Sequence, residues 1–163
     1  DNTNSIQTTA TGGIMFEIEA LQDITVKQIE FLFNSNYGVR EYELYLYSGG
    51  SIDTAGFDVT DSTGWSLLQE GTGVTDANNA FITGLQVTIT SGDTQAFYIA
   101  ALDHQAIKVI DRSGFGTYAA HTNTDLKLSG GYSTSPPDPF GSGYQTQRVA
   151  PTYISVYYEL SVV

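Results

Sequence analysis

Pairs of glutamates alternate along two stretches of the sequence, and paired carboxylates are the groups used in glycoside hydrolysis. Glu17 and Glu19 form one pair, and Glu41 and Glu43 form the other. Residues two apart in a strand share a face and lie roughly 6.5–7 Å apart. The same alternation is typical of the solvated face of any half-buried strand. We therefore expect no catalysis from these glutamates.

The two histidines, His104 and His121, do not suggest a nucleophile–base arrangement. A Ser–His–acid site needs a histidine oriented by a carboxylate. Asp103 is adjacent to His104, so in a strand the two side chains point to opposite faces. No Gly-x-Ser-x-Gly segment occurs, and the absence of cysteine excludes a thiol nucleophile and a zinc–thiolate site. We predict no catalytic residue and a protein that is not an enzyme.

An acidic loop at 48–64 contains the carboxylates expected of a calcium site. Asp53, Asp58 and Asp61 supply hard oxygen ligands, which calcium prefers. Their spacing is not that of an EF-hand. A solvated loop without a metal explains the same residues. We therefore expect either no cofactor or calcium bound at this loop.

Aromatic residues are abundant, with eleven Tyr, eight Phe and one Trp. Tyr45 and Tyr47 lie opposite the apolar face of their predicted strand, and Tyr153 and Tyr157 do so near the C-terminus. Exposed rings of this kind provide a stacking surface for sugars, which makes Tyr45 and Tyr47 candidate glycan contacts. Cross-strand aromatic packing or contact with a neighbouring subunit would explain them equally well.

Whole-chain properties exclude several partners. The 163 residues suit one domain, and the net charge of −12 opposes binding to nucleic acid or to anionic membranes. No apolar run approaches the roughly 18 residues of a membrane span, so we expect no membrane insertion. The sequence begins at Asp1 without Met, from which we expect a mature form whose secretion leader has been removed.

Apolar and polar residues alternate along most of the chain, with Gly, Asn, Asp and Ser between the alternating segments. The phase changes at Lys27–Gln28, which predicts a bulge or a strand break. Residues 130–143 are rich in Gly, Ser and Pro and are not expected in a central strand. We predict an all-β antiparallel sandwich or jelly roll of about nine to ten strands, formed by residues 14–163.

Residues 1–13 form a separate, β-prone N-terminal arm that ends at Gly12–Gly13. Either it is a frayed terminus or ordinary edge strand, or it is a donor strand that pairs with a neighbour's sheet. In the second case Ile6, Thr8 and Ala10 form its inserted face. The acceptor edge is then predicted in the last strand, which has no Pro, Lys or Arg after Pro151; its candidate contact residues are Tyr153, Tyr157, Leu160 and Val162.

The run Gly-Ile-Met-Phe-Glu-Ile-Glu-Ala at 13–20, followed by Asp-Ile-Thr-Val at 23–26, resembles the opening of a secreted bacterial β-sandwich module of the Gly-x-Met-Phe-Asp-Val-x-Ala type. The similarity continues through Tyr45-x-Tyr47-x-Gly49, Gly64-Trp65-x-Leu67, 91–99 and 154–158. The layout is also similar to subunits of extracellular fibres assembled by donor-strand complementation. These resemblances imply an exported sandwich without catalytic residues.

Together these features predict a structural subunit of an extracellular filament or cell-surface appendage. Its partner would be other copies of the same chain, joined by β-strand complementation into a helical homopolymer. The alternative is a carbohydrate-binding, lectin-like adhesive module, with glycans as the partner.

Overall fold

The computed structural model describes residues 7–32, 40–73, 79–102, 107–111, 120–134, 139–141, 149–150 and 153–161. These ranges contain thirteen strands and no helix, so the predicted all-β class is confirmed. In particular, the described part of the chain has no apolar helix of membrane-spanning length.

The largest sheet has six antiparallel strands. Its order is β10 (Ala120–Thr122), β11 (Leu126–Thr134), β2 (Gly13–Ala20), β8 (Thr94–Ala101), β4 (Arg40–Tyr47) and β5 (Trp65–Gly73). The strands β10 and β5 therefore form its two edges.

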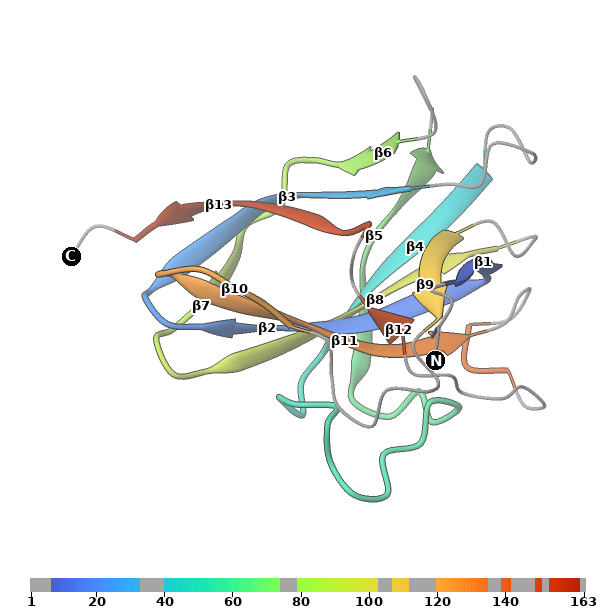
Figure 1. Cartoon of the computed structure of the whole chain (residues 1–163), viewed down its shortest axis with the longest axis horizontal. Helices are drawn as coiled ribbons and strands as arrows, with labels where there is room; N and C mark the ends of the chain where they lie inside the picture. The colour runs from blue at the N-terminus through green and yellow to red at the C-terminus, as the bar shows by residue number, and fades with distance from the viewer. Residues whose placement is uncertain are drawn as a thin grey trace, which may run out of the picture.

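A smaller sheet faces the first one, and Figure 1 shows the two as separate layers. It contains β13 (Ser155–Leu160), β3 (Ile24–Leu32) and β6 (Asn79–Ile82), and β7 (Val87–Ile89) pairs with another part of β3. A third sheet has the order β1 (Gln7–Thr11), β9 (Ile107–Asp111) and β12 (Val149–Ala150).

The predicted antiparallel sandwich is confirmed, whereas the jelly-roll connection stays a prediction. The thirteen strands exceed the nine or ten that were expected. The difference arises partly because strands as short as β10 and β12, with three and two residues, are too brief to show alternation in the sequence.

The main core lies between the two large sheets and is built from the predicted alternation. Ile14, Phe16, Ile18 and Ala20 of β2 are all buried there. Phe16 stacks on Phe97 of β8 with 5.5 Å between ring centroids, a favourable aromatic geometry. Other large contributors come from the facing sheet and from β9, and include Ile24, Val26, Ile29, Phe31 and Ile107.

The predicted irregularity at Lys27 is a β-bulge. Tyr157 of β13 pairs with Gln28 and Tyr158 pairs with Val26, so Lys27 is the extra residue of β3. The extra residue brings Val26 and Ile29 to the same face of β3, although they are three residues apart, and both are buried. The prediction from the phase change is therefore confirmed.

The expectation for the glycine-rich segment is wrong at its start. β11 continues through Thr134, and its residues from Gly130 onward pair with β2. A bulge at Gly131 makes this pairing possible. A Cβ there would lie 2.4 Å from the carbonyl oxygen of Met15, so glycine is needed for the two strands to approach.

Gly12 and Gly13 do not separate the arm from the sandwich. The Gly12 N–H donates to the Thr134 carbonyl at 2.9 Å, and the Gly12 carbonyl accepts from the Ala101 N–H at 2.7 Å. At Gly13 a Cβ would lie 2.6 Å from the Tyr98 ring. Close packing, rather than a hinge, therefore accounts for Gly13.

Candidate functional site

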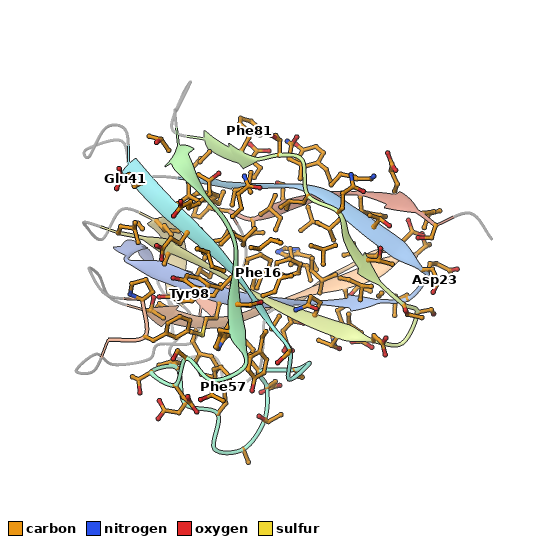
Figure 2. The ribbon with its side chains drawn as sticks, turned by 180° about the vertical axis from the view of Figure 1, so that it is seen from behind. Phe16, Asp23, Glu41, Phe57, Phe81 and Tyr98 are labelled. Carbon is orange, nitrogen blue, oxygen red and sulfur yellow. The ribbon has the colours of Figure 1, made fainter. Side chains whose placement is uncertain are left out.

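The outer face of the six-stranded sheet carries a second apolar cluster, beneath the loop 48–64. We call it the outer aromatic cluster. Its buried members are Met15, Ile52, Val59, Ala96, Tyr98 and Ala100, and six half-buried aromatic residues pack against them: Tyr45, Tyr47, Phe57, Trp65, Tyr132 and Phe140. Figure 2 shows Phe57 on the loop beyond this face and Phe16 between the sheets.

Tyr45 and Tyr47, the candidate glycan contacts, belong to this cluster. The Tyr45 ring lies 5.8 Å from Tyr98 and 5.2 Å from Phe140 between centroids. The Tyr47 ring lies 4.9 Å from Trp65 and 5.8 Å from Phe57. Both rings therefore make the aromatic packing that the sequence left open as an alternative, and glycan binding stays a prediction.

Glu17 lies beneath the loop, which differs from the solvated position expected of an alternating glutamate. Its side chain is only 8% exposed. Its carboxylate accepts hydrogen bonds from the Ile52 N–H at 2.7 Å and from the Ser51 hydroxyl at 2.9 Å. The expectation was wrong because a distant segment covers this part of the strand and supplies donors to the buried carboxylate.

Two of the other three candidate glutamates have side-chain partners. Glu19 pairs with Lys127, whose Nζ is 3.3 Å from Oε2. Glu43 accepts a hydrogen bond from the Tyr45 hydroxyl. Glu41 is exposed at the β4 end of the sheet.

Of the two histidines, the structure describes His121 alone. His121 is exposed on the edge strand β10. Asp103 and His104 lie outside the described residues. The expectation that the protein is not an enzyme stays a prediction.

The three aspartates proposed for calcium belong to the loop 48–64. Asp58 accepts hydrogen bonds from the hydroxyl and N–H of Thr60, at 2.7 and 2.8 Å, and these bonds lower its pKa. Hydrogen bonds from Thr63 likewise lower the pKa of Asp61. Asp53 is exposed. Across the described ranges, no three acidic, His or Cys side chains gather as a metal site would require, so calcium stays a prediction.

The described part of the N-terminal arm pairs within its own chain. Thr8 lies opposite Ile110 and Ala10 opposite Lys108 in the antiparallel β1–β9 pair. Ile6 lies outside the described residues. The described part of the arm is thus paired with β9 of its own chain, and its exchange between subunits stays a prediction.

The predicted acceptor strand, β13, is an edge of the smaller sheet. Within the described residues it pairs with β3 alone. Tyr157 and Leu160 are 48% and 52% exposed, whereas Tyr153 is half-buried and Val162 lies outside the described residues. The Tyr157 hydroxyl donates to Glu30 at 2.9 Å, and this bond raises the pKa of Tyr157.

Tyr158 links β13 to the six-stranded sheet through side-chain hydrogen bonds. Its hydroxyl donates to Asp125 Oδ2 at 2.8 Å and accepts from the Asn123 side-chain amide at 3.1 Å. Burial, followed by the bond to Asp125, raises the pKa of Tyr158. Because Asn123 and Asp125 lie between β10 and β11, the edge strand β13 lies beside that hairpin.

A second open edge, β5, is not among the acceptor residues predicted from the sequence. It runs through Gly73 and pairs with β4 alone among the described strands. A bulge makes Leu68 the extra residue, and Leu67 and Leu68 are 50% and 40% exposed. The adjacent leucines, which break the alternation, were a signal of the bulge but not of the edge position.

The exposed apolar side chains concentrate on edge strands, which include β6 at the other end of the smaller sheet. Of the six large hydrophobic side chains exposed in the described residues, Leu67 and Leu68 lie on β5, Phe81 on β6, and Tyr157 and Leu160 on β13. Only Leu21 lies in a turn. The charged residues of β5 and β13 are a single glutamate each, and neither strand contains proline.

Comparison with known proteins does not add a family to this description. No family model matches the sequence. No curated protein is significantly similar to it.

Proposed function

We propose that the chain is a structural subunit of an extracellular filament or cell-surface appendage, in which strand pairing joins neighbouring copies. The observation that carries this proposal is the concentration of exposed apolar side chains on edge strands, five of the six in the described residues. An open edge presents unpaired backbone N–H and C=O groups that another strand can pair with.

The composition of the edges supports pairing rather than its avoidance. Natural edge strands are commonly protected by lysine, proline or a bulge. β13 contains neither lysine nor proline, and the extra residue of its bulged pair belongs to β3. β5 also contains no basic residue and no proline, but its bulge at Leu68 is one of these protective features, so the support from β5 is weaker than that from β13.

The N-terminal arm supports the proposal less strongly than the edges do. Exchange of β1 between copies would repeat the same backbone pairs with β9, which makes it a low-cost route to assembly. However, the residue that joins β1 to β2 is Gly12, which is hydrogen-bonded to both Thr134 and Ala101. The open edges need no such rearrangement.

Assembly of the purified chain tests this function. We expect light scattering to rise with protein concentration and electron microscopy to show filaments. Higher ionic strength should favour assembly, because it screens repulsion between subunits of charge −12.

Charged substitutions on the edges provide the matched test. Leu67→Lys and Tyr157→Lys should each weaken assembly while leaving the thermal unfolding of the subunit close to that of the parent. Ala55→Lys, at an exposed loop position, adds the same charge away from the edges and should assemble normally. A chain that stays monomeric at high concentration and high salt would refute the proposed function.

A further inference from the structure

We infer that β5 of one copy pairs with β13 of the next copy, so that each junction joins two different edges. This inference rests on the proposed function and specifies which surfaces of the two copies meet. The two strands lie in different sheets of the sandwich.

The positions of β5 and β13 suit a filament to which subunits can be added without limit. The six-stranded sheet has β10 at one edge and β5 at the other. β13 lies on the β10 side, because Tyr158 bonds to Asp125 beside β10. The strand β5 is therefore at the far side of the sandwich from β13. A contact between two different surfaces of this kind leaves one of each free on every new subunit, which gives a filament when the rotation does not close.

Strand length favours the same pairing. β5 has nine residues and β13 has six, whereas β6 has four and β10 has three. The number of backbone hydrogen bonds across a junction increases with the length of the shorter strand, so β13 is the best partner for β5 apart from the β5 strand of the other copy.

The side chains of the two edges are complementary. Tyr157 and Leu160 point to opposite faces of β13, because they are three residues apart and the bulge belongs to β3. Leu67 and Leu68 on β5 would therefore pack beside one of the two, and all four side chains are at least 40% exposed in the subunit. Removing this apolar surface from water favours association.

Charge argues against pairing of β5 with itself. Glu70 of β5 lies directly opposite Glu43 of β4, and Glu41 is on the same face. A β5–β5 contact would bring two such acidic groups together, and like charges across strands are destabilising. The one acidic residue of β13, Glu159, is by contrast paired with Lys27 at 3.2 Å, so that a β5–β13 contact would bring Glu70 near a neutralised carboxylate.

Single cysteines test this pairing cleanly, because the chain has none of its own. Leu68→Cys and Tyr157→Cys are made separately, and one carries a small tag so that mixed and self-linked pairs differ in mass. The two proteins are assembled together and treated with a short bis-maleimide. We expect the mixed pair to predominate at least fivefold over either self-linked pair, and Ala55→Cys, an exposed loop position, to give little linkage with any variant.

The double variant with both cysteines in one chain should give a ladder of covalent oligomers. Leu67→Cys replaces Leu68→Cys if the latter unfolds, as judged by circular dichroism. Predominance of Leu68→Cys self-linkage or of Tyr157→Cys self-linkage would overturn the inference in favour of a symmetric contact. Filaments without mixed linkage would overturn it while leaving the proposed function intact, and failure of the parent chain to assemble would refute both.

Discussion

The main core and the outer aromatic cluster lie on opposite faces of the same sheet but are built differently. The main core is formed largely by alternating residues on paired strands, and its large members, such as Phe16, Ile18 and Phe31, have no exposed surface. The outer aromatic cluster depends on a loop that supplies Ile52, Phe57 and Val59. Most of its aromatic residues are half-buried.

This difference indicates two levels of stability in one domain. Strand pairing fixes the main core, so it should be lost only when the whole sandwich unfolds. The loop 48–64 is held over the outer face by side-chain contacts and by the bonds to Glu17. Segments with fewer buried contacts open locally at lower free energy, so the loop should open before the sandwich does.

The largest expected effect comes from the main core. Phe16→Ala removes a fully buried ring that stacks on Phe97, and it should lower the free energy of unfolding by about 3–5 kcal/mol. Urea denaturation measures this change. Phe81→Ala, at a ring that is 48% exposed, is the matched control and should cost about 0.5 kcal/mol or less. Equal losses for the two variants would contradict the description of the core.

The buried carboxylate gives a smaller effect that should be local. Glu17→Ala leaves the Ile52 N–H and the Ser51 hydroxyl without their acceptor, at a cost of about 1–3 kcal/mol. Hydrogen exchange of the Ile52 amide should become much faster, while amides of β2 and β8 keep their protection. Glu17→Gln retains one acceptor oxygen and should fall between the parent and Glu17→Ala.

Loss of one ring from the outer cluster should be milder still. Phe57 packs against Tyr47 and Tyr132, with centroid distances of 5.8 and 5.5 Å. Phe57→Ala should lower the free energy of unfolding by about 1–2 kcal/mol and speed amide exchange in the loop. A loss as large as that of Phe16→Ala would show that the loop and the sandwich form one cooperative unit.

The smallest effect concerns the exposed aspartates of the loop. Hydrogen bonds from Thr60 and Thr63 lower the pKa values of Asp58 and Asp61 in the folded chain. Their stabilising contribution is therefore present above the unfolded pKa of about 4 and is lost as the pH falls through the folded values. NMR titration should give midpoints below those of unfolded peptides. Thr60→Val should raise the Asp58 midpoint and leave that of Asp61 nearly unchanged.

The main core was largely predictable from the sequence, because it depends on local alternation. The buried face of β2 and the bulge at Lys27 both follow from the positions of apolar residues within one strand. The continuation of β11 past Gly130 could not be predicted in this way, because the bulge at Gly131 depends on the close approach of Met15 from another strand.

The candidate site was less predictable, because contacts between distant segments define it. Glu17 and Glu19 look alike in the sequence, yet only Glu17 lies beneath the loop. That Tyr157 and Leu160 lie on an edge was consistent with their strand's composition. The edge position of β5 depends on strand order, which the sequence pattern does not contain.

The alignment of β13 has a mechanical consequence. This last strand runs in line with the long axis of the molecule and is bonded to β3 along its length (Figure 1). Tension applied along the strand would load those bonds simultaneously, in shear, instead of peeling them apart one after another. The Lys27–Glu159 and Tyr157–Glu30 contacts would add side-chain resistance to the same sliding motion.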